Sequence, residues 1–421
     1  MTTPTFFGRM IVSLLAILCV SGADWMQFRG PTGLGLTDES GLPTEWGSGK
    51  NVVWKTALPG PGGSSPVVVG NRVYLTSYTG YGIEQGEGDV NELMRHLVCL
   101  DRQSGSILWT KQFQPKLPEH EYQGNGAWHG FSTSTPTSDG ERLYVFFGKS
   151  GVFCFDLDGN EVWHASVGEK TNGWGSACSP ILYGDLLIVN ASVESGAIVA
   201  LDKATGQEVW RTSGIGSSWN TPVLVTLPGG GTELVVSIQD ALLGLAPDTG
   251  EELWRADGIH RYVCPSVVHH DGVVYAIGGG GTSLAVRAGG RGDVTKTHTL
   301  WRQNKGSNVS SPIYRDGHLF WASDSRGIAY CQDAATGEFV YEQRLSPSPD
   351  RIYASPILVD GNLLYVSQHN GVYIVAAKPE FELVAHNVFE DDESRANASP
   401  VAHDGQLLLR SDGFLYCLGR R

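Results

Sequence analysis

Short apolar runs alternate with tight-turn residues along almost the whole chain. In a representative stretch the runs cover 179–183, 186–189, 197–201 and 207–211, and Gly, Asp, Asn and Thr-Gly residues separate them. Runs of this length between such residues are typical of β-strands joined by turns. Because the runs are almost continuously apolar, both faces of each strand are expected to be covered. The pattern predicts a unit of four antiparallel strands.

This unit recurs eight times. Each copy opens on a small residue followed by proline, and most copies close on Gly-x-x-x-Trp; the opening prolines are Pro66, Pro136, Pro180, Pro222, Pro265, Pro312, Pro356 and Pro400. Successive openings are 70, 44, 42, 43, 47, 44 and 44 residues apart, so only the first gap is irregular. A unit of this size cannot bury its apolar faces alone, so the copies must stack. Radial stacking gives a β-propeller.

The last copy is incomplete, and a strand near the other end of the chain is predicted to complete it. Residues 398–418 supply three strands, whereas the apolar segment 51–56 precedes the first copy. Such an N-terminal strand closes the ring and removes an open sheet edge. We therefore predict an all-β, eight-bladed propeller with four-stranded blades. Deletion through Lys55 is expected to be costly, whereas trimming through Met26 removes no predicted strand and is expected to cost much less.

Residues 1–23 are predicted to be a signal peptide, so that residues 24–421 form one propeller domain. Arg9 precedes an apolar run over 10–20, and Ser21-Gly22-Ala23 is a small-residue cleavage site. The run is short for a membrane span, so no span is expected after cleavage; an uncleaved anchor is the alternative. Leu18 is bulky where lipidation of Cys19 needs a small residue. These features predict export to the periplasm or cell envelope.

The net charge limits the kinds of partner, and the cysteine positions limit the possible disulfide bonds. The formal net charge is −14 and no basic stripe is present, which argues against a nucleic-acid partner and indicates a soluble surface. Six cysteines remain after cleavage, without Cys-x-x-Cys, a haem-attachment motif or an adjacent pair, and most stand at equivalent places in separate blades. We predict no disulfide bonds.

Each blade has four antiparallel strands, so alternate connections emerge on the same face of the ring. The loops between second and third strands therefore share one face with the crossovers between blades. Both long insertions of the first blade, 81–96 and 112–131, fall on this face, and long loops on a rigid scaffold are where binding usually occurs. The segments before the opening prolines reach the same face beside the channel, and we call this region the channel mouth. Its predicted ligand-binding residues are Trp128, His129, Trp174, Trp219, Asn220, Arg261, Tyr262, Asn308, Arg326, Arg351, Tyr353, His369, Arg395 and Asn397.

Aromatic rings, amides and arginines around a concave mouth suit a small planar or anionic ligand. The alternative is that these residues only fill the channel and tie the blades together. Other motifs point to turns and loops rather than chemistry: 156–160 lacks the later Glu of a calcium loop, and 278–281 lacks the helix of a phosphate site. His269-His270 has no partner at metal-ligand spacing. No catalytic residue and no metal site is predicted.

The strand-turn-strand stretch Ala200 to Trp210, echoed at 99–109 and 246–254, resembles the pyrroloquinoline quinone-like repeat. Trp-Met-Gln-Phe-Arg-Gly-Pro at 25–31, and the segment 57–66, resemble exported bacterial members of that superfamily, particularly the planctomycete type. The resemblance covers essentially the whole mature chain and implies the eight-bladed fold. The superfamily includes quinone-dependent alcohol and sugar dehydrogenases and also non-catalytic scaffolds of outer-membrane barrel assembly.

Departures from the dehydrogenases favour the scaffold. Those enzymes are longer, many carry an adjacent cysteine pair, and their calcium site uses Glu, Asn and Asp from motifs that we do not find here. Trp174, Trp219 or Arg326 are candidates to contact a quinone, but no motif fixes the match. We therefore expect an exported, non-enzymatic, monomeric propeller that binds a small ligand or an envelope protein at the channel mouth. The alternative is a short pyrroloquinoline quinone-dependent dehydrogenase of alcohols or sugars, with calcium and an external electron acceptor.

Overall fold

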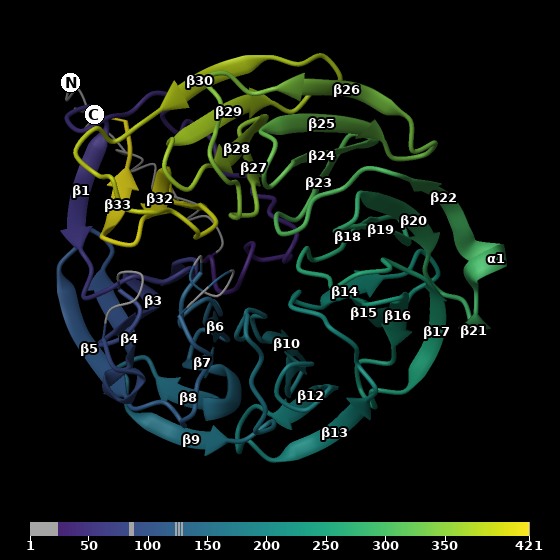
Figure 1. The fold of residues 1–421 in the computed structure, drawn as a ribbon, viewed down its shortest axis with the longest axis horizontal. Coiled ribbons are helices and arrows are strands. Elements are labelled where there is room, and N and C mark those ends of the chain that lie inside the picture. Colours follow the sequence, from purple (N-terminus) through teal and green to yellow (C-terminus); the bar gives the residue numbers. More distant parts are fainter. Residues whose placement is uncertain (1–23, 84–87, 123, 125–126, 128, 421) are drawn as a thin grey trace, which may run out of the picture.

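Eight sheets surround a central channel, as the repeats predict (Figure 1). The structure is a computed structural model that describes residues 24–83, 88–122, 124, 127 and 129–420, so the predicted signal peptide lies outside the described residues. Within them, no helix is both long and apolar enough to cross a membrane. Cys99, Cys154, Cys178, Cys264, Cys331 and Cys417 are free thiols.

The first four blades follow the chain in order. Blade 1 contains β2 (Val67–Val69), β3 (Arg72–Thr79), β4 (Met94–Asp101) and β5 (Ile107–Phe113). Blade 2 contains β6 (Thr137–Ser138), β7 (Arg142–Phe146), β8 (Val152–Asp156) and β9 (Glu161–Ala165). Blade 3 contains β10 (Ile181–Tyr183), β11 (Leu186–Ala191), β12 (Ala197–Asp202) and β13 (Glu208–Ser213). Blade 4 contains β14 (Val223–Thr226), β15 (Thr232–Ile238), β16 (Ala241–Leu245) and β17 (Glu252–Asp257).

The remaining blades complete the ring. Blade 5 contains β18 (Val268–His270), β19 (Val273–Gly278), β20 (Thr282–Arg287) and β22 (Thr299–Gln303). Blade 6 contains β23 (Ile313–Arg315), β24 (His318–Ala322), β25 (Ile328–Asp333) and β26 (Phe339–Arg344). Blade 7 contains β27 (Ile357–Val359), β28 (Asn362–Val366), β29 (Val372–Ala376) and β30 (Leu383–Asn387). Blade 8 contains β31 (Val401–His403), β32 (Gln406–Arg410), β33 (Phe414–Leu418) and β1 (Val52–Ala57).

The predicted closing strand is confirmed. Strand β1 pairs antiparallel with β33, with Val52 opposite Leu418 and Ala57 opposite Phe414, and the two strands lie side by side (Figure 1). Trp54 on β1 is buried, and its indole Nε1 donates to the carbonyl of Arg102 in blade 1 at 2.9 Å. The first and last blades are therefore joined by a strand pair and by a buried aromatic side chain.

The Gly-x-x-x-Trp pattern is explained by contacts between neighbouring blades. Four outer-strand indoles donate to a carbonyl in the third turn of the next blade at 2.9–3.0 Å, and these indoles belong to Trp54, Trp163, Trp210 and Trp301. A glycine of that turn, with φ between 72° and 76°, lies against each ring, and an added Cβ would come within 2.4–2.6 Å of it; these glycines are Gly105, Gly206, Gly250 and Gly337. Only glycine combines this positive φ with so close an approach.

A ring of hydroxyl groups explains the Ser/Thr-Pro pattern. One hydroxyl residue per blade precedes the innermost strand: Ser65, Thr135, Ser179, Thr221, Ser266, Ser311, Ser355 and Ser399. The backbone N–H of each of the first seven donates to the hydroxyl of the next, and these seven bonds of 3.0–3.1 Å run from blade 1 to blade 8. We call this ring the hydroxyl belt. Between blades 8 and 1, the Arg410 guanidinium donates instead to the carbonyl of Ser64 at 2.7 Å and to its hydroxyl at 2.6 Å.

The hydroxyl belt shows that the fifth copy of the repeat begins two residues later than its proline indicates. Ser266, which follows Pro265, is the belt residue there, and Val267 occupies the position that proline has in the other blades. With Val267 as the opening residue, the slightly unequal gaps of 43 and 47 residues both become 45. The preserved feature is thus the hydroxyl group rather than the proline.

An insertion between β20 and β22 was not predicted. It contains β21 (Gly292–Asp293) and the one-turn helix α1 (Thr295–His298), and β21 pairs in parallel with β17 at the outer edge of blade 4. Two short 3-10 helices, η1 (Val90–Glu92) and η3 (Gly148–Ser150), lie in loops of blades 1 and 2.

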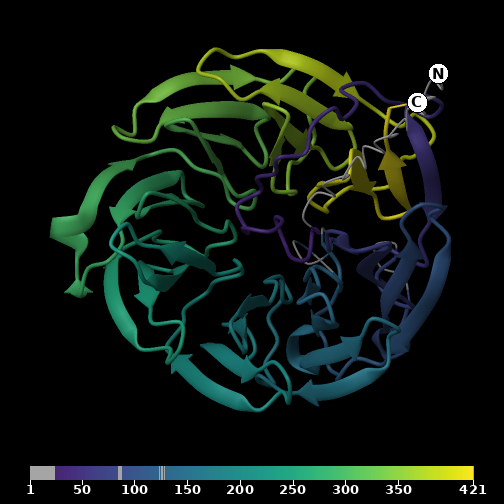
Figure 2. The same ribbon diagram turned by 180° about the vertical axis from the view of Figure 1, so that it is seen from behind.

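The N-terminal segment 24–46 crosses the channel on the face opposite the mouth (Figure 2). The carbonyls of Trp25 and Met26 accept hydrogen bonds from Val68 in blade 1 and Ser138 in blade 2, and Gly35 accepts from Leu358 in blade 7. Trp25 is only 1 % exposed. Trimming through Met26 removes no strand, as predicted, but it removes Trp25 and the carbonyls that accept hydrogen bonds from the innermost strands of blades 1 and 2.

Candidate functional site

A cavity of about 390 Å³ lies at the channel mouth, where the crossovers lead into the innermost strands. Eight of the fourteen predicted residues line it: His129, Trp174, Trp219, Tyr262, Asn308, Arg351, Tyr353 and Asn397. They come from seven different crossovers, so only the closed ring brings them together. We call this space the central cavity.

One wall of the central cavity is aromatic. The rings of Trp174 and Trp219 are 5.3 Å apart, and Tyr262 meets Trp174 edge to face at 4.3 Å between centroids. The Trp219 indole Nε1 donates to the carbonyl of Gly175 at 2.8 Å, which fixes its ring, whereas Trp174 is only half-buried. Trp174, together with the half-buried Tyr262, therefore offers the accessible ring surface of this wall.

The wall formed by blades 6 and 7 is polar. The Asp324 carboxylate accepts the backbone N–H of Asn308 at 3.1 Å and its side-chain amide at 3.4 Å. The carbonyl of Asp324 also accepts the N–H of Ile352, which places Arg351 and Tyr353 beside it. Burial raises the pKa of Tyr353 to about 12, so its hydroxyl remains protonated. This wall thus offers donors and acceptors in close proximity.

Hydroxyl groups of the belt and the side chain of Phe28 contribute the remaining lining on the channel side. Phe28 also borders a second space of about 350 Å³ on the opposite face, together with Pro31 and Leu34. The N-terminal segment therefore separates the mouth from the far end of the channel. The sequence analysis missed this role, since 25–31 carries no strand pattern.

The other predicted residues lie elsewhere. Asn220 is buried within the wall, where its amide donates to Ser218 at 2.9 Å. Arg261 is exposed and lies over Gly280, and the exposed Arg326 donates to the Tyr330 hydroxyl at 3.3 Å. Trp128 lies outside the described residues. The expectation that Asn220, Arg261 and Arg326 line the same space as the others is wrong.

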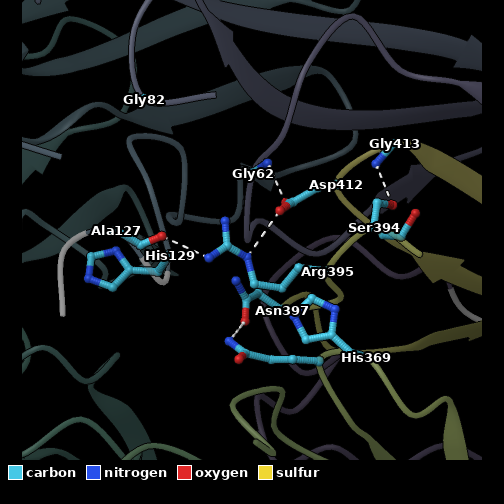
Figure 3. A network of polar contacts seen from close by, with 12 residues as sticks. Gly62, Gly82, Ala127, His129, His369, Ser394, Arg395, Asn397, Asp412 and Gly413 are labelled. Atoms are coloured by element: carbon cyan, nitrogen blue, oxygen red, sulfur yellow. Dashed lines mark hydrogen bonds and ion pairs between the residues drawn. The ribbon is translucent and has the colours of Figure 1, made fainter. Parts of the chain in front are cut away.

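His369 and Arg395 line an adjacent space of about 370 Å³, which we call the side cavity. Arg351 borders both cavities, and Gln368 of the side cavity donates to Asn397 of the central cavity at 2.7 Å. Figure 3 shows Asn397 and His369 near Arg395, whose guanidinium bonds to the Ala127 carbonyl at 2.7 Å and to Asp412 at 3.2 Å. The two cavities are thus neighbours with a shared arginine.

The predicted contribution of the first-blade insertions has a structural basis. Tyr81 and Tyr122 come from the two insertions, their rings are 6.5 Å apart, and the Tyr81 hydroxyl accepts the N–H of Tyr122 at 3.0 Å. Phe131 packs against both rings. Because Tyr122 also lines the side cavity, this aromatic contact builds one of its walls.

The two insertions also contribute Arg95 and Glu119 to a buried ionic cluster that the sequence analysis did not predict. The Arg95 guanidinium bonds to Glu119 at 2.9 Å, and both side chains are buried. Glu194 accepts from the Ser176 hydroxyl, and burial raises the pKa of Glu194 to about 7. Arg95, Glu119 and Glu194 all lie outside the lining of both cavities.

The central cavity carries balanced charge. Among its described lining residues, Arg351 is the one guanidinium and Asp324 the one carboxylate. Burial lowers the pKa of His129 to about 4, so this imidazole is neutral at pH 7. A quinone with several carboxylates needs more than one cation, and calcium prefers several oxygen ligands, carboxylates among them. Within the described residues, no group of three His, Cys, Asp or Glu side chains is placed to hold a metal ion. The residues present do not fit a calcium-bound quinone.

Comparison with known proteins places the chain in a family. The family described as outer membrane protein assembly factor BamB matches residues 90–214 and 194–421. The chain belongs to this family. Its pyrroloquinoline quinone-like repeats and propeller fold are therefore both established.

A BamB-family relative from Burkholderia pseudomallei (strain K96243), named outer membrane protein assembly factor BamB, is 27% identical over 194 residues. The match covers 42% of this chain and 41% of the relative, so it spans less than half of the relative's length. Among solved structures, BamB from Moraxella catarrhalis has a TM-score of 0.60 at 15% identity, covering 88% of this chain and 97% of its own.

Enzymes share the same fold. The quinohemoprotein alcohol dehydrogenase from Comamonas testosteroni has a TM-score of 0.65 at 12% identity, covering 94% of this chain and 81% of its own. A europium-containing methanol dehydrogenase has a TM-score of 0.63 at 13% identity, covering 93% and 90%. At these identities each likeness concerns the fold alone.

Proposed function

We propose that this BamB-family chain is an exported, non-catalytic binding or scaffolding propeller of the cell envelope. Its working surface is the channel mouth, which takes a small ligand or an envelope protein. The observation that carries the proposal is the family match over 90–421, because the matched relatives are named as outer membrane protein assembly factors. The rigid ring and the lined cavity at its mouth fit a binding role.

A second candidate is a short quinoprotein oxidoreductase of alcohols or sugars. Two dehydrogenases share the fold, and the observation that favours this candidate is the Trp174–Trp219 wall, against which a planar ring fits. The balanced charge of the central cavity argues against it, since Arg351 is the one lining cation among the described residues. We derive no catalytic step through a quinone here.

A titration of the purified mature chain separates the two candidates. The chain is mixed with pyrroloquinoline quinone and calcium, and an artificial electron acceptor is followed in the presence of simple alcohols and aldoses. Neither saturable quinone binding nor turnover is expected. Turnover that requires the quinone and is abolished by Trp174→Ala would overturn the scaffold proposal.

The position of the working surface has its own test. A photo-crosslinking residue at exposed Arg261 reports on the mouth, and one at exposed Asp316, in the first-to-second strand turn of blade 6, reports on the opposite face. A protein partner at the mouth is expected to give a discrete adduct in the cell envelope from position 261 alone. Adducts from position 316 alone would place the working surface on the other face.

A further inference from the structure

The central and side cavities differ in lining but lie next to each other, and this arrangement restricts the chemistry of a ligand. The central cavity has an aromatic wall opposite a polar one, whereas the side cavity is lined mainly by polar groups of Asp350, Arg351, Gln368, His369 and Arg395. A ligand that occupies both must be longer than one ring and must present polar groups along its length.

Resting on the function proposed above, we propose that the two cavities are adjacent subsites for an uncharged oligosaccharide. One sugar ring lies against Trp174 in the central cavity, and the next ring lies beyond Arg351 in the side cavity. This differs from the planar or anionic ligand predicted from the sequence.

The aromatic wall fits the apolar face of a sugar ring. A pyranose has a C–H face that removes apolar surface from water when it covers an indole, while its hydroxyls point outward around its edge. Trp174 and Tyr262 are both half-buried, and the two rings meet edge to face at 4.3 Å. Trp219 is held from behind by its bond to Gly175 at 2.8 Å. The wall is therefore preorganised to accept a flat, partly apolar ring.

The polar wall fits the hydroxyls at the edge of the ring. A hydroxyl both donates and accepts, so it is best matched by a carboxylate acceptor next to amide or guanidinium donors. Asp324 and Asn308 form such a pair, with 3.1 Å between the Asn308 nitrogen and the Asp324 carboxylate, and Arg351 stands beside them. The lining carries one positive and one negative side chain, Arg351 and Asp324, and an uncharged ligand leaves this balance of charge unchanged.

The shared arginine argues for more than one sugar ring. Arg351 borders both cavities, and the bond of 2.7 Å from Gln368 to Asn397 fixes an amide pair at their boundary. In the side cavity, Arg395 is held by Asp412 at 3.2 Å and His369 lies 3.9 Å from Asp350. Arg395 and His369 therefore each face a carboxylate, which limits the excess charge of this polar subsite.

Calorimetric titration of the mature chain at pH 7 tests the inference, with cellotriose, xylotriose, maltotriose and chitotriose and the corresponding monosaccharides as probes. At least one trisaccharide is expected to bind with a Kd below about 1 mM, at least about tenfold more tightly than its monosaccharide. Trp174→Ala is expected to weaken both by about tenfold or more, whereas Trp174→Phe retains most of the affinity. His369→Ala removes only the advantage of the trisaccharide, and Arg261→Ala, on the same face but outside both cavities, changes neither.

The outcomes are distinguishable. If none of the trisaccharides binds below about 10 mM, or if binding is unchanged in Trp174→Ala and Trp174→Phe alike, the inference is overturned while the proposed function stands. Quinone-dependent turnover overturns the proposed function instead. Circular dichroism of each variant confirms that its fold is retained, and tight binding of tricarboxylates in place of sugars would also contradict the uncharged ligand.

Discussion

Replacing Trp54 by alanine tests how the ring is closed. Trp54 stands on β1, where it is 9% exposed and its indole donates to the Arg102 carbonyl at 2.9 Å. Trp301 is a matched control, because it is 8% exposed and donates to the Ala334 carbonyl at the same 2.9 Å between blades 5 and 6. The two substitutions remove the same contacts at closing and non-closing junctions.

Loss of a buried tryptophan costs about 3–5 kcal/mol, including its cavity and its hydrogen bond. With an unfolding entropy of about 2.1 cal/mol/K per residue over roughly 400 residues, 1 kcal/mol corresponds to about 1.2 °C. Both Trp54→Ala and Trp301→Ala are therefore expected to lower the melting temperature by about 4–6 °C.

Hydrogen exchange separates the two junctions. In Trp54→Ala, β1 loses the side chain that anchors it to blade 1, so exchange should accelerate in β1 and in its partner β33. In Trp301→Ala, faster exchange should be confined to β20 and β22. If Trp54→Ala melts within about 1 °C of the unchanged protein and keeps its β1 protection, Trp54 does not contribute to closure as argued.

Three further outcomes are expected. Ser311→Ala leaves the buried N–H of Ser266 without its acceptor and should lower the unfolding free energy by about 1–3 kcal/mol in urea titrations, with the matched belt variant Ser311→Thr close to the unchanged protein. A chain that begins after Met26 lacks the buried Trp25 and should melt about 4–6 °C below one that begins at residue 24; equal melting temperatures would show that the segment contributes little. Because burial raises the pKa of Glu194 from 4.5 to about 7, the folded state binds a proton that the unfolded chain releases between these values. Stability should therefore fall as pH rises from about 4.5 to about 7 and stay level above, and Glu194→Gln should flatten this slope in urea titrations across the interval.

The fold was predictable because each blade repeats the same local signals. Apolar runs, turn glycines and terminal tryptophans are all short-range features, and they located eight blades and the closing strand. The start of blade 5 was misplaced by two residues. Its proline, Pro265, precedes the belt residue Ser266, whereas in the other blades the proline follows the belt residue. The sequence analysis placed each blade by its proline, whereas the feature common to all eight blades in the structure is the belt hydroxyl.

The site was predictable only in part. Trp174, Tyr262 and Arg351 were correctly predicted at the channel mouth because each stands at the end of a crossover, just before an innermost strand, and every crossover ends at the mouth. Strand parity does not determine which way a single side chain turns, and Asn220 therefore points into the wall beside Trp219. Asp324 lies in a second-to-third strand loop, whose approach to the crossover of the next blade depends on ring geometry alone.

The direction of bonding in the hydroxyl belt has an electrostatic consequence. All seven bonds run the same way around the channel, from the N–H of one blade to the hydroxyl of the next. Dipoles arranged head to tail in a circle cancel one another, so the inner wall is polar without producing a net field across the channel. The circle is interrupted between blades 8 and 1, where a full positive charge on Arg410 replaces the eighth dipole. The belt of this eight-bladed ring is thus interrupted electrostatically at one junction. That junction, between blades 8 and 1, is also where the two ends of the propeller meet.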